Sequence, residues 1–223
     1  MELTEQSDVV EGKTALCYEV LQHLGDCYIA VDNYGQAGKC YEKAASLCPD
    51  LPQPYVGLGL TALGNNKLDD AEIAFRVARR LDGNCAKAYA GLAAVAHQRA
   101  DYKLAFRMYL KCLELDTNNL AALLGLFQTS CRMGSFEQVI YFLRVYLRMH
   151  PGDTSVMFCL ATLYIKQDDL QQSQRLLKDI LVLDAANRDA ADLLEEVEHN
   201  LAQGLEPRQG RFCGAGNDNA KEF

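Results

Sequence analysis

YEVLQHLGDCYIAVDNYGQAGKCYEKAASLCPDL, residues 18–51, is the stretch that decides the fold. Two groups of apolar residues in it have the three- or four-residue spacing that places side chains on one face of a helix: Leu21, Leu24 and Tyr28, then Ala37, Tyr41 and Ala44. Between the groups, Asp32-Asn33 ends one helix, and Asn33 is a suitable N-cap for the next. The stretch therefore predicts a helix–turn–helix unit.

The same pattern returns every 34 residues along the chain. The position of Tyr41, for example, is next occupied by Phe75, Tyr109, Leu143 and Leu177. A fixed period of this length is typical of a stacked array in which each unit buries its apolar faces against its neighbours. Five units without insertions are predicted, over residues 18–51, 52–85, 86–119, 120–153 and 154–187.

The unit resembles the tetratricopeptide repeat, whose pattern runs from a large apolar residue through Leu-Gly, Tyr, Ala and an aromatic residue to Pro. In residues 18–51 that pattern is carried by Leu21, Leu24-Gly25, Tyr28, Ala37, Tyr41 and Pro49. The resemblance implies an all-α fold: a right-handed α-solenoid of stacked helix-turn-helix repeats. Repeats of this family bind many unrelated partners, so the resemblance alone does not identify a partner.

Both ends of the chain differ from the repeats. Residues 1–17 form a polar N-terminal segment leading into the first helix, which is expected over 13–31. Residues 188–203 predict a lone capping helix, which a solenoid needs at its end. Its apolar face is expected to consist of Ala191, Leu194, Val197 and Leu201. Residues 204–223 contain Gly, Pro, Asn and Asp with few apolar residues and are interpreted as a disordered tail.

The formal net charge is −8, with a mildly basic middle between acidic ends. That distribution does not suit nucleic acid, which favours a concentrated basic face. No apolar run has the length of a membrane span, and the acidic start lacks a signal core, so a cytoplasmic protein is expected. The nine cysteines have no Cys-x-x-Cys spacing and are interpreted as small buried hydrophobic residues in a reduced compartment. The exception is Cys213 in the tail, expected to be exposed.

Residue patterns for catalysis are missing from the sequence. It has no glycine-rich phosphate loop, and its four histidines lie in different units without partners at metal-ligand spacing. Adjacent acids such as Asp69-Asp70 lie at helix starts, where the positive end of the helix dipole stabilises their negative charge. We therefore expect no enzyme activity, no metal and no cofactor.

The resemblance implies that the first helix of each unit lines a concave face. Twelve residues there are candidate partner-binding residues: Gln22, Asp26, Ile29, Val56, Leu60, Leu63, Lys87, His97, Leu124, Gln128, Phe158 and Ile165. Some family members hold a partner's terminal carboxylates with basic residues on this face. Here Lys87 alone fits, and Gly57 and Gly91 occupy two of the slots, which disfavours such a ligand. The apolar members suit an amphipathic helix or an extended apolar peptide; alternatively, several are core residues.

These observations favour a non-catalytic protein–protein interaction module, an adaptor that holds a partner peptide or helix in its concave groove. The alternative is a self-associating structural scaffold or assembly chaperone, and a homo-oligomer is possible because solenoid ends can stack. A regulatory subunit of an enzyme is a third hypothesis, which no residue pattern supports.

Overall fold

The structure is a computed structural model that describes the backbone of residues 2–203 and the side chains of residues 16–202. The predicted tail and Cys213 lie outside the described residues. The described chain contains eleven helices and no strand. They are α1 (Glu2–Ala30), α2 (Tyr34–Leu47), α3 (Pro52–Gly64), α4 (Leu68–Leu81), α5 (Ala86–Gln98), α6 (Tyr102–Leu115), α7 (Leu120–Met133), α8 (Glu137–Met149), α9 (Thr154–Lys166), α10 (Leu170–Leu183) and α11 (Arg188–Gln203).

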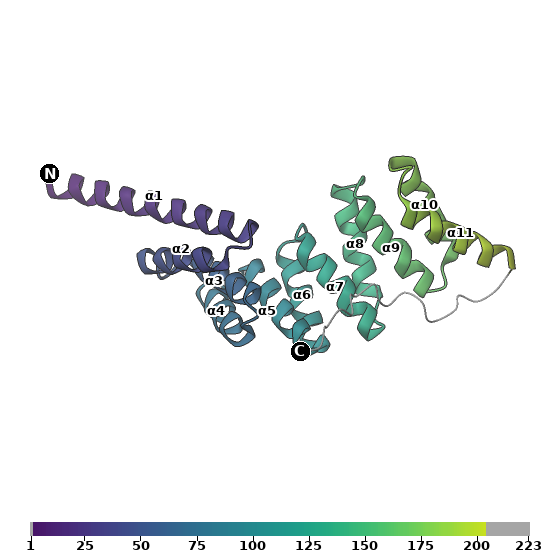
Figure 1. Cartoon of the computed structure of the whole chain (residues 1–223), viewed down its shortest axis with the longest axis horizontal. Helices are drawn as coiled ribbons and strands as arrows, with labels where there is room; N and C mark the ends of the chain where they lie inside the picture. The colour runs from purple at the N-terminus through teal and green to yellow at the C-terminus, as the bar shows by residue number, and fades with distance from the viewer. Residues whose placement is uncertain (1, 204–223) are drawn as a thin grey trace, which may run out of the picture. The chain divides into compact units, whose positions relative to one another are not determined.

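The predicted all-α solenoid of helix pairs is confirmed (Figure 1). Each 34-residue repeat contributes two consecutive helices, and α1 packs on α2, α3 on α4, α5 on α6 and α9 on α10. The chain forms two compact units, Met1–Phe142 and Leu143–Phe223, here called unit 1 and unit 2. One continuous stack over residues 18–203 stays a prediction. Helix α1 begins at Glu2, well before the expected start at residue 13.

Side-chain caps define where several helices begin. Asn33, Asp101 and Asp169 each accept a hydrogen bond from the backbone N–H three residues later, at 3.2, 3.0 and 3.1 Å. Asn33 is thus the predicted cap of α2, and Asp101 and Asp169 cap α6 and α10 in the same way. The same bond is made by three further caps, at Asn119, Asp153 and Asn187. Such caps satisfy N–H groups that have no partner inside the helix.

The turn inside each helix pair also repeats with the 34-residue period. In every 34-residue repeat, one residue in the left-handed backbone conformation follows the first helix: Asp32 (φ 56°), Asn66 (58°), Ala100 (60°), Gly134 (72°) and Asp168 (64°). Glycine adopts this conformation without steric cost, and Asn and Asp tolerate it better than alanine does. The period is therefore present in the backbone as well as in the side chains.

The core of unit 1 is built from aromatic rings inserted between first helices of successive pairs. Tyr41 of α2 is fully buried, between Gly25 of α1 and Gly57 of α3. A Cβ added to those glycines would lie only 2.6 and 2.4 Å from the Tyr41 ring. Phe75 of α4 meets Gly91 of α5 in the same way, at 2.3 Å. Each ring thus depends on a position without a side chain.

The first helices of successive pairs in unit 1 also contact one another directly: α1 contacts α3, α3 contacts α5, and α5 contacts α7. Second helices, in contrast, mainly contact the first helices before and after them in the chain. Helices that approach most closely lie on the inner side of a curved stack. In unit 1 the odd-numbered helices therefore line the concave side.

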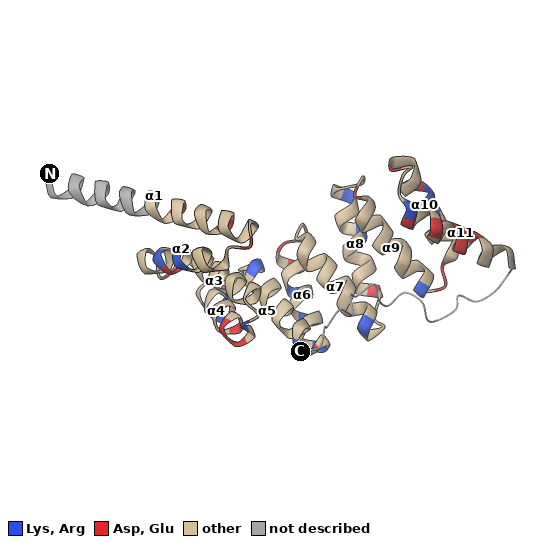
Figure 2. Cartoon of the chain, viewed as in Figure 1, with Lys and Arg blue, Asp and Glu red and all other residues tan. Residues whose placement is uncertain are grey.

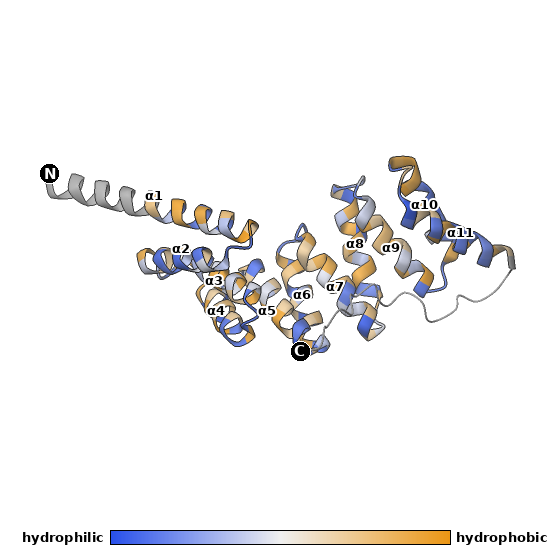
Figure 3. Cartoon of the chain, in the orientation of Figure 1, coloured by the Kyte–Doolittle hydropathy of each residue, from blue (hydrophilic) through white to orange (hydrophobic). Residues whose placement is uncertain are grey.

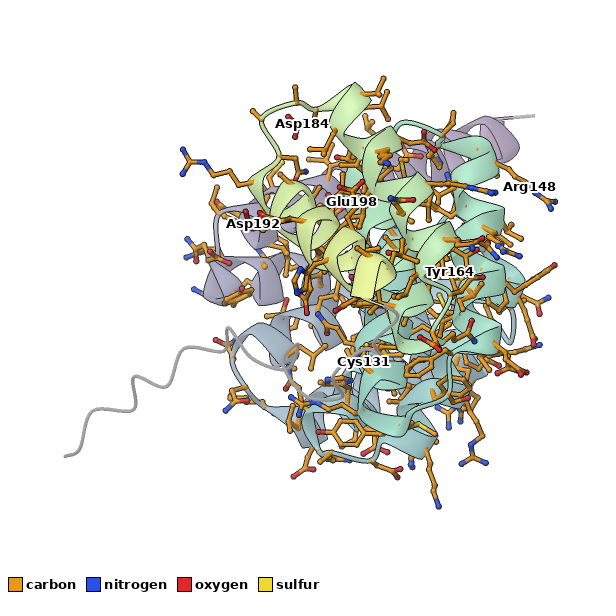
Figure 4. The ribbon with its side chains drawn as sticks, turned by 90° about the vertical axis from the view of Figure 1, so that its right-hand side faces the viewer. Cys131, Arg148, Tyr164, Asp184, Asp192 and Glu198 are labelled. Atoms are coloured by element: carbon orange, nitrogen blue, oxygen red, sulfur yellow. The ribbon has the colours of Figure 1, made fainter. Side chains whose placement is uncertain are left out.

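Unit 2 ends in α11, which has the predicted bounds and packs on α10. Its predicted apolar face is correct at Val197, which is buried, and at Leu194, which packs against the core. It is wrong at Ala191 and Leu201, which are exposed, whereas Ala190 and Leu193 are buried. Figure 2 shows acidic residues in red along α11. Asp192 is exposed, whereas Glu198 pairs with Lys178 of α10 at 2.9 Å; both acids are labelled in Figure 4. The exposed side of α11 is therefore polar, and its role as a capping helix stays a prediction.

Candidate functional site

A groove of about 480 Å³ lies on the odd-numbered helices of unit 1. It is called here the α1–α3–α5 groove, and its walls come from α1, α3, α5 and the residues just before α3 and α5. The lining residues are Tyr18, Glu19, Gln22, His23, Asp26, Leu51, Gln53, Val56, Gly57, Leu60, Cys85 and Lys87. Five of the twelve predicted binding residues are among them: Gln22, Asp26, Val56, Leu60 and Lys87.

The groove has an apolar floor between walls of opposite charge. Val56 of α3 is buried, and Leu60, one turn further along α3, has 42% of its surface exposed. Glu19 and Asp26 line the groove from α1, and Lys87 lines it from α5. An apolar side chain can therefore enter against α3 while a basic group faces α1 and an acidic group faces α5.

Asp26 also connects the groove to the core. Its Oδ1 accepts a hydrogen bond from the Tyr41 hydroxyl at 2.6 Å. Burial, and then this bond to a carboxylate, raise the pKa of Tyr41 well above the ordinary tyrosine value, so the hydroxyl stays protonated and continues to donate. The core ring thereby fixes the position of one acidic wall residue.

The other seven predicted residues lie outside this groove. Leu63 packs against the core cluster around Phe75, and Phe158 and Ile165 pack against the core cluster of unit 2. For these three the structure favours the core alternative. Ile29 and Leu124 are partly buried and Gln128 is exposed, without lining the groove. Binding by any of the twelve stays a prediction.

His97, the remaining predicted residue, joins two first helices. Its Nδ1 lies 2.9 Å from Oγ1 of Thr129 in α7, and its ring meets Tyr102 edge-on at 5.3 Å between centroids. Burial, with a smaller contribution from the charge of Arg132, lowers the pKa of His97 below its ordinary 6.5. The neutral form of the His97 imidazole is thus favoured in the folded protein.

A pH-dependent stability follows from the lowered pKa of His97. The unfolded chain binds the imidazole proton more readily than the folded chain, so the contribution of His97 is present above pH 6.5 and is lost as the pH falls through the lower folded value. We expect the wild type to lose more stability between pH 7.5 and 5.5 than His97→Gln does. Urea unfolding at a series of pH values measures this, and equal losses in the two proteins would contradict it.

The structure also contains a groove that the repeat pattern does not predict. It has a volume of about 650 Å³ and lies along α2 and α4, over α3. Ile73 of α4 lines it and is strongly exposed, and Gly35 and Gly38 leave its α2 wall low. The sequence feature that could have indicated this groove is an apolar residue, Ile73, on the outer face of the second helix of a repeat. The residues that line this α2–α4 groove come from two neighbouring repeats, whereas those that line the α1–α3–α5 groove come from three.

The cysteines follow the prediction only in part. Cys40 and Cys112 are buried, and burial raises the pKa of Cys112 to about 12, so that its thiol stays protonated. Cys17 and Cys27, however, are exposed on α1, which corrects the expectation of buried cysteines. The period could not reveal this, because it does not say which face of the first helix lacks a neighbour.

In unit 2, Arg144 of α8 binds across to two neighbouring helices. Its Nε donates to the Tyr164 hydroxyl of α9 at 2.7 Å, and its Nη2 donates to Gln172 Oε1 of α10 at 3.0 Å. Tyr164 is labelled in Figure 4. These bonds fix helix packing and supply no reactive group. Among the side chains of residues 16–202, no three metal-ligating groups lie together. In the part of the chain that the structure describes, none of the helices has the length and apolar character of a membrane span.

Comparisons with known proteins agree with the observed architecture. Family models described as "Tetratricopeptide repeat" match residues 18–51 and 86–119, the first and third units. No match was found among curated proteins.

Several solved structures share the fold. Pseudomonas aeruginosa PilF is 17% identical, with a TM-score of 0.69, over 86% of this chain and 90% of that one. Yeast Tom70 is 24% identical, with a TM-score of 0.65, over 83% of this chain and only 40% of that one. YrrB, described as a TPR protein with an unusual peptide-binding site, is 16% identical, with a TM-score of 0.60, over 78% and 90%. At these identities the likeness concerns the fold.

Proposed function

Since this chain belongs to the tetratricopeptide-repeat family, we propose that it is a non-catalytic adaptor that binds a segment of a partner protein in the α1–α3–α5 groove. Tetratricopeptide repeats generally mediate protein–protein interactions through such extended surfaces. The proposal is supported above all by one observation: five residues selected from the repeat pattern line a single groove on three consecutive first helices.

The chemistry of the groove defines the segment that it would accept. An apolar anchor would contact Leu60, which with Leu51 is one of two exposed large apolar side chains that line this groove. A Lys or Arg on one side of the anchor would pair with Glu19 or Asp26, and an Asp or Glu on the other side with Lys87. Opposite charges at the two ends would set the direction of the bound segment, because the reversed segment places like charges together.

Leu60→Ala is expected to weaken binding about tenfold without changing the stability of the protein. Removing an exposed anchor costs roughly 1–3 kcal/mol of binding, and it leaves no closed cavity. Because the partner is unidentified, the probe is a set of peptides selected from a random displayed library on the full chain. Their affinities for the wild type and variants are then measured by calorimetry.

Two control variants distinguish binding in this groove from loss of folding and from binding at the α2–α4 groove. Leu63→Ala removes a core contact on the same helix, so it is expected to lower stability while leaving the affinity of the folded protein unchanged. Ile73→Ala removes an exposed side chain from the α2–α4 groove and should change neither property. If the selected peptides bind Leu60→Ala as tightly as the wild type, or lose affinity with Ile73→Ala instead, the assignment of the groove is wrong.

A further inference from the structure

The face of α1 opposite its packed side is an exposed apolar stripe. Leu16, Val20 and Leu24 have 63, 56 and 41% of their surfaces exposed, and Val31, directly after the helix, has 70%. The exposed Cys17 and Cys27 lie between them. These six residues, here called the α1 stripe, are Leu16, Cys17, Val20, Leu24, Cys27 and Val31. Figure 3 shows the orange of apolar residues along the described part of α1, which in Figure 2 is mostly uncharged tan.

The spacing within the stripe is that of a helix pair rather than of a binding groove. Cys17, Val20, Leu24, Cys27 and Val31 are separated by 3, 4, 3 and 4 residues in turn. An alternation of three and four residues keeps one seam of side chains facing a second helix. The stripe therefore fits a partner that presents one straight, uncharged helix face.

Charge argues against helix α11 as that partner. Helix α11 presents carboxylates on its outer side, among them Asp192, Glu195 and Glu196. Burying them against the uncharged α1 stripe would leave ionised groups without partners, at a high free-energy cost. Two α1 stripes can meet without that cost, because Glu19 and Asp26, the acids of α1 among the described side chains, line the α1–α3–α5 groove instead.

The four central residues of the stripe, Cys17, Val20, Leu24 and Cys27, are complementary to themselves when two copies run antiparallel. A two-fold axis level with residue 22 places Cys17 opposite Cys27 and Val20 opposite Leu24 of the second copy. Small residues then face small ones, and branched residues face branched ones. The stripe exposes roughly 500 Å² per copy, so a pair would bury a total of about 1,000 Å², the lower limit for a specific interface.

From this geometry we propose that the chain forms a symmetric dimer through antiparallel packing of two α1 stripes. The interface is isologous, since each copy contributes the same surface. It leaves the α1–α3–α5 groove of each copy open, so the dimer would present two partner-binding grooves. Its small area places it at the lower limit for a specific interface, so a weak and reversible dimer is expected.

Sedimentation velocity on the full chain, from about 1 to 200 µM, tests the dimer. The wild type is expected to shift from monomer to dimer across this range, and Val20→Glu is expected to remain monomeric because it places two buried carboxylates at the centre of the pair. Val182→Glu, the same change at a more exposed site on α10, should dimerise like the wild type. A monomeric wild type, or a Val20→Glu variant that dimerises normally, overturns the proposal.

Oxidation with copper phenanthroline in air, followed by peptide mapping, tests the orientation. Within one helix Cys17 and Cys27 are about 15 Å apart, too far for a disulfide, so a Cys17–Cys27 link must join two copies. The antiparallel pair predicts this link, and it should disappear in both Cys17→Ser and Cys27→Ser. A Cys17–Cys17 link would indicate a parallel pair and would overturn the proposed arrangement, as would no link at all between these peptides.

Discussion

Tyr41→Ala is expected to destabilise unit 1 by about 3–5 kcal/mol, the usual cost of truncating a fully buried aromatic side chain. The Tyr41 ring fills the space between Gly25 and Gly57, and neither glycine has a side chain that could close the cavity. The change also removes the hydroxyl that donates to Asp26. Urea unfolding followed by circular dichroism measures the loss, and hydrogen exchange should locate it in α1, α2 and α3.

Tyr41→Phe separates the ring from its hydroxyl. It keeps the packing and loses only the hydrogen bond to an exposed carboxylate that water can solvate, so a loss of about 1 kcal/mol is expected. If Tyr41→Ala costs no more than Tyr41→Phe, the ring does not support the stack. That result would contradict the role of Tyr41 in the core.

Gly91→Ala is expected to destabilise unit 1 by roughly 2 kcal/mol, although helix propensity alone favours alanine over glycine by about 1 kcal/mol. The reason is steric: the new Cβ would lie 2.3 Å from the buried Phe75 ring. On its other side that ring is confined by Gly59, where a Cβ would lie 2.5 Å away. The ring therefore cannot move aside. Urea unfolding measures the change.

Gly35→Ala is the matched control, because nothing lies within 4 Å of a Cβ at Gly35 in α2. There the propensity gain should appear, with an increase in stability of up to about 1 kcal/mol. Equal effects of the two substitutions would contradict the steric explanation for Gly91.

A smaller core side chain should rescue Gly91→Ala. The chain itself contains such a combination: Leu143 stands at the position of Tyr41 and Phe75, and Cys159 stands at the position of Gly57 and Gly91. We expect Phe75→Leu combined with Gly91→Ala to be more stable than the sum of the single changes predicts, by at least about 1 kcal/mol. Additive losses would show that the two positions are not coupled.

The repeat architecture could be predicted from the amino-acid sequence alone. Side chains at a 34-residue spacing carry the information about which residues meet, because every unit packs on neighbours of the same kind. From that spacing Tyr41 could be placed in the core, and caps such as Asn33 could be placed at helix starts. It also located the face on which Val56, Leu60 and Lys87 come together, since residues in equivalent slots of stacked helices share one side.

The surroundings of each repeat position, in contrast, were decided only by how the helices pack. In the sequence, Gly57 and Gly91 stand where some family members have basic residues on the binding face. In the structure, their lack of a side chain makes room for aromatic rings from neighbouring helices. Phe158 packs on a core, yet Leu60, from the same kind of helix, stays exposed. Helix α1 packs on α2 and α3, and Val20 on its other face stays exposed. Periodicity describes one unit, and exposure depends on whether a neighbouring unit is present to cover it.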